Sequence, residues 1–285
     1  MKILLTGATG FVGRHLVPQL LARGHRLTVL VRDPSSVSGF PWGADVEALA
    51  FDLASTDFDA LPDWGSQDAL IHLAWPNLPN YGASFHFEAN LPQSYQFIKR
   101  CVERGIRHVL ATGTCFEYGM RDGCLVESMG ARPANPYAFA KDTLRGFVEL
   151  LQKETPLTFQ WARLFYMYGE GQNPKSLLAQ LDRAIDEGQP SFDMSLGEQL
   201  RDYLPIEEVA RRLALLLDHP TLQGVTNICS GEPISVRRLV EQHIAKRKAT
   251  IALNLGFYPY SPFEPLAFWG DANRMRQIDA IRDSD

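Results

Sequence analysis

The sequence has few cysteines and no long apolar run. Its four cysteines form no CxxC pair and no spacing typical of metal ligands, and they are Cys101, Cys115, Cys124 and Cys229. They therefore predict neither a disulfide framework nor a metal site. No stretch approaches the roughly 18 uncharged apolar residues of a membrane-spanning helix, and the first residues, MKILLTGATG, lack the apolar core and cleavage site of a signal peptide. We expect a cytoplasmic protein with reduced thiols, no metal and no membrane partner.

The sequence also has no large excess of charge of either sign. The chain of 285 residues has 28 Lys and Arg against 33 Asp and Glu, a net charge of −5. This balance argues against a broad nucleic-acid-binding surface, so no nucleic acid is expected as a partner. Apolar residues make up 45% and charged residues 21%, which is ordinary for a globular chain that buries a large core. An anionic ligand must then be held by a few placed Arg or Lys side chains.

Short apolar runs alternate with amphipathic stretches through residue 165, which is typical of βαβ units in a parallel sheet. The runs that predict strands lie at residues 2–5, 26–31, 46–51, 69–73, 108–112 and 158–164. The stretches that predict helices lie at residues 12–23, 85–104, 137–153, 177–187 and 207–217, and residues 225–229 add one more strand. Right-handed crossovers then give an α/β fold with a doubly wound parallel sheet of the Rossmann type.

A glycine-rich segment, TGATGFVG, directly follows the first predicted strand and precedes the first helix. Gly7, Gly10 and Gly13 permit a tight turn there, let backbone N–H groups approach a pyrophosphate and let the helix pack close to the strand. The segment, with Phe11 and Val12 inside it, therefore predicts a dinucleotide-binding loop. The alternative is a glycine-rich turn that serves helix packing only.

The end of the second predicted strand indicates which dinucleotide binds. An acidic residue there would hold the adenosine ribose of NAD, whereas an arginine would accommodate the 2′-phosphate of NADP. The sequence has Arg32 at this place, and Arg14 lies just after the last glycine of the loop, so we predict NADP. Asp33 keeps NAD open as the alternative, because it either starts the turn before Pro34 or binds a ribose hydroxyl.

Tyr137 and Lys141 lie four residues apart at the start of a predicted helix, so their side chains share one face. A tyrosine with a pKa of about 10 is a poor acid or base at neutral pH, but a nearby ammonium lowers that pKa. Tyr137 could then give a proton to a carbonyl oxygen as a hydride reaches its carbon, while Lys141 holds the nicotinamide ribose. Taken alone, a Tyr and a Lys at this spacing are usually a surface pair.

The order of these motifs resembles that of the extended short-chain dehydrogenase/reductases, in particular the NAD(P)-dependent nucleotide-sugar epimerase/dehydratase family. The resemblance rests on the glycine-rich loop, a strand that ends in TGTCFEYG before Tyr137, and the Asn-Pro pair just upstream of Tyr137. It extends over nearly the whole chain. Further segments that match in order are Asp52-Leu53, His72-Leu73-Ala74, Asn90, Arg163 before Tyr168-Gly169, Arg201-Asp202-Tyr203 and Asn227-Ile228-Cys229-Ser230-Gly231.

The resemblance implies a role for each matching residue. Tyr137 would be the proton donor or acceptor, Lys141 its pKa-lowering partner, and Thr114 the hydroxyl that orients the substrate carbonyl. Arg201 would hold the diphosphate of a nucleotide-sugar substrate. The alternatives are that Thr114 only fills the strand end and that Arg201 is a solvated surface residue. The other implied cofactor contacts are Asp52 and Leu53 at the adenine, then Leu73, Ala74, Trp75, Asn90 and Thr112, and the other implied substrate contacts are Cys115, Phe116 and Tyr166.

Two departures from the family pattern narrow the reaction. Sugar 4,6-dehydratases of this group place an Asp-Glu pair directly after the Thr, whereas this chain has Cys115 and Phe116, so dehydration is not expected. Glu117 comes one residue later and would point to the other face if the strand continued. Tyr166 stands where many relatives have an Asn that contacts the substrate diphosphate, which leaves the nucleotide open.

Several other residues have a packing explanation beside a functional one. His72 lies in an apolar strand and is predicted to be a core residue rather than an acid or base. Trp75 either walls the cofactor or sugar pocket or packs in the core, and His86 and Cys124 are weaker candidates for substrate contacts. The aromatic, proline-rich segment at 251–269 is predicted to be core, with stacking on a base as the alternative.

These interpretations divide the chain into two regions. Residues 1–168 form a dinucleotide-binding domain, to which residues 205–230 return, while residues 169–204 and 231–285 form a smaller substrate-binding region. The helices that carry Asn90 and Tyr137 either form the four-helix interface of a homodimer, as the resemblance implies, or only cover the sheet.

Three functions remain open at this stage. The first is an NADPH-dependent reductase of a nucleotide-linked 4-keto-6-deoxy sugar in deoxysugar biosynthesis, with hydride delivered to C4 and Tyr137 as proton donor. It rests on Arg32 and on the missing Asp-Glu pair. The second is an NAD-dependent nucleotide-sugar epimerase that uses the same Tyr, Lys and Thr. The third is a non-catalytic NADP-sensing protein, which the presence of both Tyr137 and Lys141 disfavours.

Overall fold

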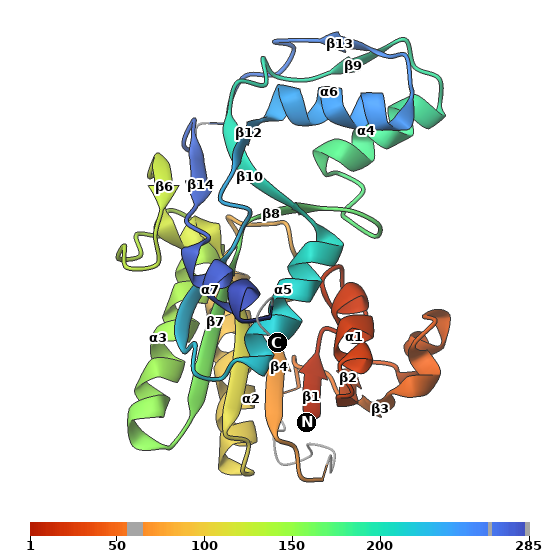
Figure 1. Cartoon of the computed structure of the whole chain (residues 1–285). Helices are drawn as coiled ribbons and strands as arrows, with labels where there is room; N and C mark the ends of the chain where they lie inside the picture. The colour runs from red at the N-terminus through yellow and green to blue at the C-terminus, as the bar shows by residue number, and fades with distance from the viewer. Residues whose placement is uncertain (56–64, 262–263, 283–285) are drawn as a thin grey trace.

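The computed structural model describes residues 1–55, 65–261 and 264–282. Its largest element is a seven-stranded sheet with the order β11-β7-β5-β4-β1-β2-β3, in which every neighbouring pair is parallel (Figure 1). The strands are β1 (Lys2–Thr6), β2 (Arg26–Val31), β3 (Glu47–Ala50), β4 (Ala69–His72), β5 (His108–Thr114), β7 (Thr158–Leu164) and β11 (Gly224–Ile228). The strand order reverses between β1 and β4, as in a doubly wound sheet, so the predicted fold class is confirmed.

Helices cover both faces of this sheet, because the side chains of each strand alternate between the faces. The covering helices are α1 (Gly13–Ala22), α2 (Leu91–Glu103), α3 (Pro136–Glu154) and α5 (Ile206–Asp218). On one face Ile3 and Leu5 of β1 belong to an apolar cluster with α1 and α5. On the other face Leu4 belongs to a cluster with α2 and α3. Burial on both faces explains why the strands read as continuous apolar runs in the sequence.

The segment before α2 departs from the single helix predicted at residues 85–104. Residues His86–Asn90 form a π-helical turn (η3), and the N–H of Leu91 donates to the carbonyl of His86. Pro92 lies in the first turn of α2 and has no N–H for the α-helical bond to Glu88. The wider turn buries His86 and Asn90.

A smaller region stands beyond the carboxyl ends of the strands (Figure 1). It contains a three-stranded sheet of β12, β10 and β8 and a two-stranded sheet of β13 and β9, and an apolar cluster joins α4 to α6. Its elements are β8 (Tyr166–Tyr168), α4 (Leu177–Asp186), β9 (Ser191–Asp193), β10 (Leu200–Pro205), β12 (Pro233–Ser235), α6 (Val236–Arg247) and β13 (Ala252–Asn254). The remaining elements before the last helix are η1 (Pro34–Gly39), η2 (Gly43–Asp45), η4 (Cys115–Tyr118), β6 (Gly123–Leu125) and β14 (Phe268–Gly270), of which β6 and β14 pair.

The last helix, α7 (Asn273–Arg282), lies with the large sheet and not with the smaller region to which the sequence assigned residues 231–285. Met275 and Ile278 belong to the same apolar cluster as α1 and α5. A helix that follows the smaller region thus returns to cover α5 and the end strand β11 (Figure 1). No helix among the described residues combines the length and the apolarity that crossing a membrane requires.

The aromatic segment before α7 is core only in part. Phe268 is buried in an apolar cluster with Tyr118. Phe257 and Tyr258 are 55% and 54% exposed, so the prediction of a core role is wrong for these two rings. Two further residues of this segment, Pro262 and Phe263, lie outside the described residues.

Candidate active site

A cleft runs along the carboxyl ends of the parallel strands and is lined by residues of both the large sheet and the smaller region. Its volume is about 1180 Å³. Open α/β sheets bind ligands at this place, where the strand order reverses. The predicted site residues that line it are Gly7, Gly10, Phe11, Val12, Gly13, Arg32, Asp52, Leu53, Leu73, Ala74, Trp75, Asn90, Thr112, Thr114, Cys115, Phe116, Tyr137, Lys141 and Tyr166. Arg14 and Arg201 lie outside this lining as far as the structure describes it.

The glycine-rich loop forms one wall of the cleft. Gly7 has a φ of 78°, a backbone conformation that L side chains rarely adopt. A Cβ atom at Gly13 would overlap the carbonyl of Gly7 and the backbone of Ala8. Because α1 begins at Gly13, the positive end of its dipole lies at the cleft. The loop therefore fits the pyrophosphate of a dinucleotide.

Arg32 lies at the edge of the cleft beyond β2. Arg32 is exposed, lines the cleft and has no ion pair among the described residues. Asp33, by contrast, caps η1: its carboxylate accepts hydrogen bonds from the N–H of Ser35 at 2.9 Å and from the Ser35 hydroxyl at 2.8 Å. Arg14 lies over the Phe40 ring, 5.4 Å from its centroid. The carboxylate that could compete for a ribose is thus engaged in a turn, while Arg32 remains available.

The start of α3 positions Tyr137 and Lys141. The side chain of Asn135 is the N-cap and accepts a hydrogen bond from the N–H of Ala138 at 2.9 Å. Because α3 begins at Pro136, Tyr137 lies in its first turn and Lys141 one turn later on the same face. Both side chains are buried, at 8% and 2% exposure, and both line the cleft. The pair is therefore not a solvated surface feature.

Thr114 and Lys141 complete the centre of the site. The Thr114 hydroxyl lies near the Tyr137 phenol and opposes the rise in its pKa. Lys141 Nζ donates to the carbonyl of Thr112 at 2.9 Å and lies 4.1 Å from the centroid of the Trp75 ring. A phenol, a hydroxyl and an ammonium thus converge on one part of the cleft, which is an arrangement that can protonate a carbonyl oxygen.

Burial shifts the pKa values of both groups on α3. It raises the pKa of the Tyr137 phenol, the neighbouring Tyr81 acts in the same direction, and the Thr114 hydroxyl opposes it. Burial lowers the pKa of Lys141 to about 7, against the effect of the Glu117 carboxylate. The expectation that Lys141 lowers the pKa of Tyr137 does not hold in this structure, because burial outweighs it. Tyr137 is therefore a protonated phenol at neutral pH and suited to donate a proton.

Glu117 lies on the side of the sheet to which a Cβ at Gly113 would point, opposite to that of Thr114, although β5 does not continue to it. β5 ends at Thr114, and η4 turns Glu117 back beneath it, where Glu117 is fully buried. Its carboxylate accepts hydrogen bonds from the N–H of Thr114 at 2.8 Å, from Trp161 Nε1 at 3.1 Å and from Arg163 Nε at 2.6 Å. Sequence reasoning missed this role, although a Thr followed three residues later by a Glu is the capping-box pattern that the structure shows here.

Arg201 and Tyr166 share one carboxylate in the smaller region. Arg201 is 4% exposed, and its Nη2 donates to Glu264 Oε2 at 3.0 Å. The hydroxyl of Tyr166 donates to the same oxygen at 2.8 Å, and the Arg201 guanidinium lies 4.5 Å from the centroid of the Phe268 ring. Arg201 is thus a buried, paired residue rather than a solvated one. No sequence signal singled out Glu264, since it lies 63 residues after Arg201.

Aromatic rings surround the proposed proton donor. The Tyr81 ring centroid is 5.3 Å from that of Tyr137 and 5.3 Å from that of Phe116, and Phe116 meets Tyr166 at 6.2 Å. Tyr81 also accepts the backbone N–H of Tyr137 on its carbonyl at 3.1 Å. Sequence reasoning missed Tyr81, because it lies in an irregular loop where no periodicity or motif marks it.

The residues with weaker indications of a functional role lie partly in the core and partly at the surface. His72 is buried and bonds Thr6 Oγ1 through Nδ1 at 2.9 Å, and burial lowers its pKa to about 3, with Lys141 acting in the same direction. His72 is therefore a neutral core residue. His86 is buried beside Trp75, while Cys124 is exposed on β6. All four cysteines are free thiols.

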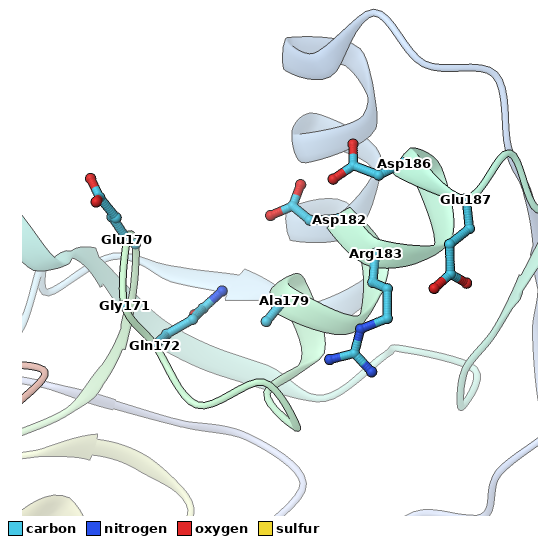
Figure 2. Close-up of a pocket in the computed structure, with 9 residues that line it drawn as sticks. Glu170, Gly171, Gln172, Ala179, Asp182, Arg183, Asp186 and Glu187 are labelled. Carbon is cyan, nitrogen blue, oxygen red and sulfur yellow. The ribbon is translucent and has the colours of Figure 1, made fainter.

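A second, smaller pocket of about 520 Å³ lies between the loop at residues 169–172 and α4 (Figure 2). Asp182 and Asp186 give it an acidic rim. Asp182 accepts hydrogen bonds from His243 at 2.7 Å and from Arg247 at 2.7 Å, and Arg247 also pairs with Asp186. These charges serve to join α4 to α6, so we assign no binding role to the pocket.

Known proteins resemble this chain in both sequence and fold. The NAD dependent epimerase/dehydratase family matches residues 3–229. The chain is 31% identical over 275 residues to dTDP-6-deoxy-L-talose 4-dehydrogenase (NAD(+)) of Aggregatibacter actinomycetemcomitans, and the match covers 95% of this chain and 99% of that protein.

Two solved structures illustrate the likeness in fold. One is a UDP-N-acetylglucosamine 4-epimerase from Methanobrevibacter ruminantium M1 in complex with UDP-N-acetylmuramic acid. Its TM-score is 0.85 at 22% identity, over 97% of this chain and 91% of that one. The other is MoeE5 in complex with UDP-glucuronic acid and NAD, with a TM-score of 0.79 at 24% identity, over 98% of this chain and 92% of that one.

Proposed function

The chain belongs to the NAD dependent epimerase/dehydratase family, and from this premise we propose that it is an NADPH-dependent reductase of a nucleotide-linked 4-keto-6-deoxy sugar. The observation that carries the proposal is the contrast between Arg32 and Asp33 at the end of β2. Arg32 lines the cleft without an ion pair among the described residues, while Asp33 is engaged by Ser35. An unpaired guanidinium at this place suits the 2′-phosphate of NADP, and a cofactor with that phosphate usually serves net reduction.

The central side chains suit reduction of a ketone. The glycine-rich loop would hold NADPH, which when bound would supply a hydride to C4 of the sugar. Tyr137 then donates its phenolic proton to the C4 oxygen, which completes an alcohol, and Thr114 orients that oxygen through its hydroxyl. Tyr137 then takes a proton from solvent, while Lys141, whose Nζ lies at the cleft wall, would hold the nicotinamide ribose.

The residues next to Thr114 and Tyr137, where the sugar would lie, support a 6-deoxy substrate. Cys115 and Phe116 follow Thr114 where a dehydratase would need an acid and a base, and Phe116 and Tyr81 pack beside Tyr137. Apolar rings suit a C6 methyl group better than a hydroxymethyl or a carboxylate. The relative at 31% identity is named for chemistry at C4 of a dTDP-linked 6-deoxy sugar, which favours the same substrate class here.

A second candidate is an NAD-dependent nucleotide-sugar epimerase or dehydrogenase. The relative from Aggregatibacter actinomycetemcomitans is named for NAD(+), and MoeE5 was solved with NAD. Such an enzyme would use the same Tyr137, Lys141 and Thr114, but it would need Arg32 to tolerate a cofactor without the 2′-phosphate.

We further propose a homodimer that forms through α2 and α3. One stripe of α3 exposes Phe139, Phe147 and Leu150, at 53%, 39% and 57%, and Tyr95 of α2 contacts Phe147 with ring centroids 5.1 Å apart. Exposed aromatic residues at helical spacing on neighbouring helices are typical of a helix-bundle interface. Light scattering of the wild type and of Phe147→Glu tests this, with a dimer expected for the first and a monomer for the second.

Calorimetric titration with NADPH and NADH tests the cofactor assignment. Cofactor-stripped protein is expected to bind NADPH at least about tenfold more tightly than NADH, because the 2′-phosphate gains a charged hydrogen bond. Arg32→Asp should abolish that preference. Arg26→Asp, which makes the same change at the exposed start of β2, should leave it intact. Tighter binding of NADH by the wild type would favour the second candidate.

A further inference from the structure

The loop after β4 anchors an indole at the centre of the site. Trp75 is 9% exposed, and its Nε1–H donates to His86 Nδ1 at 3.0 Å. His86 is fully buried, and its Nε2 lies 2.9 Å from the carbonyl of Asn80. Because Nδ1 accepts from the indole, the ring proton lies on Nε2, which donates to Asn80. His86 is thus held as one neutral tautomer.

One face of the indole lies toward Lys141. Its Nζ lies 4.1 Å from the centroid of the Trp75 ring, where an ammonium and an indole face attract each other. Nζ also donates to the Thr112 carbonyl at 2.9 Å. A carbonyl and an aromatic face therefore determine where the ammonium sits at the cleft wall. His86 packs against Tyr137 as well, with ring centroids 5.3 Å apart.

We propose that His86 is a positioning residue, which holds the Trp75 indole so that the ring fixes the Lys141 ammonium at the cleft wall, one helical turn from Tyr137. This inference rests on the role that the proposed function gives to Lys141. The π-helical turn supports it, because it brings His86 under Trp75 while Asn90 donates to the Pro76 carbonyl at 3.1 Å and fixes the same loop.

Four single variants separate positioning from mere packing. His86→Phe keeps a ring but removes the acceptor, His86→Gln keeps an acceptor, and Trp75→Phe removes the donor. His243→Phe is the matched control, because His243 bonds Asp182 on the far side of the smaller region. With NADPH and a 4-keto-6-deoxy sugar nucleotide, His86→Phe should lower kcat about tenfold, whereas His86→Gln should stay within about threefold of the wild type and the control within about twofold.

The double variant shows whether the effect passes through the indole. Once Trp75→Phe has removed the donor, adding His86→Phe should cost less than about twofold in kcat. The proposal would be overturned if the loss of kcat in the double variant equalled the product of the two single losses. Full activity of His86→Phe would overturn it as well. If His86→Phe does not fold, Trp75→Phe decides alone: an unchanged kcat would contradict the proposal, and a loss of several-fold would support it.

An indole N–H spectrum tests the link without substrate. The chain has five tryptophans, and the ¹H–¹⁵N signal of Trp75 is the one that disappears in Trp75→Phe. That signal should move in His86→Phe and remain in place in His243→Phe, and an unmoved signal in His86→Phe would overturn the proposed hydrogen bond. If the wild type reduces no 4-keto sugar nucleotide, the proposed function fails, while this spectrum still reports on the His86–Trp75 link.

Discussion

Thr114 donates its backbone N–H to the carboxylate of Glu117 at 2.8 Å, so a fully buried acid holds the residue whose hydroxyl faces the cleft. The same carboxylate accepts from Arg163 at 2.6 Å, and Arg163 is itself 2% exposed. The position of Thr114 therefore depends on a buried ion pair behind the sheet. Burial raises the pKa of Glu117, and the Arg163 charge opposes that shift.

Glu117→Gln keeps the shape of the side chain but removes the carboxylate nearest to the Arg163 guanidinium and leaves it only Asp142, whose Oδ1 lies 3.8 Å from Nη2. We expect the free energy of unfolding to fall by about 3 to 5 kcal/mol, because breaking a buried pair strands a charge. Urea titration measures this change. Glu154→Gln, at the exposed end of α3, should change it by less than about 0.5 kcal/mol. Equal values for the two variants would contradict a supporting role for Glu117.

Tyr137→Phe removes the phenolic proton and little else. Since proton transfer by a placed side chain contributes about 10² or more, kcat should fall by that factor while the Kd for NADPH stays within about twofold. Steady-state assays and calorimetry measure the two quantities. Tyr258→Phe, on an exposed ring, is the control and should match the wild type. Comparable turnover in Tyr137→Phe would show that another group protonates the C4 oxygen.

Glu264→Gln tests whether Arg201 is a substrate contact. In the structure the Arg201 guanidinium is paired with Glu264, so a substrate diphosphate must compete with that carboxylate. Neutralising the competitor should tighten the binding of dTDP or UDP several-fold, as measured by calorimetry, since the phosphates then meet an unopposed positive charge. Glu198→Gln, on an exposed residue, should have no effect. Unchanged or weaker binding in Glu264→Gln would mean that Arg201 serves the fold alone.

The lowered pKa of His72 predicts that the free energy of unfolding decreases in acid. Its pKa is lowered to about 3, so between pH about 6.5 and 3 the unfolded chain binds a proton on His72 that the folded chain does not. Stability therefore decreases as the pH falls through this window, by about 1.4 kcal/mol per pH unit for this group. His72→Asn should show a shallower slope in urea titrations at several pH values. The same slope in wild type and variant would show that other groups cause the acid loss.

Much of the fold could be predicted from the sequence because its signals are local. The structure has β2 at Arg26–Val31 and β7 at Thr158–Leu164, as the apolar runs predict, and α1 begins at the last glycine of the loop. The spacing of Tyr137 and Lys141 likewise suffices to place them on one helical face, and the structure has both lining the cleft.

What the sequence did not predict depends on contacts between distant residues or on the exact end of an element. The contacts of Glu117 depend on η4, which turns the chain at Cys115, whereas the sequence analysis considered only a continued strand. The pairing of Arg201 with Glu264 and the packing of α7 on α5 join segments that no local pattern relates. The raised pKa of Tyr137 follows from how deeply α3 is buried, which spacing alone does not reveal.

The fate of the hydride tests the central claim most directly. The protein would be incubated with excess NADPH that carries deuterium at the transferable C4 position of the nicotinamide, and with a dTDP-linked or UDP-linked 4-keto-6-deoxy sugar. The account predicts that each sugar reduced consumes one NADPH and carries one deuterium at its C4, and that Tyr137→Phe slows both. Interconversion of two nucleotide sugars with a catalytic amount of NAD, and no consumption of NADPH, would contradict it and identify an epimerase.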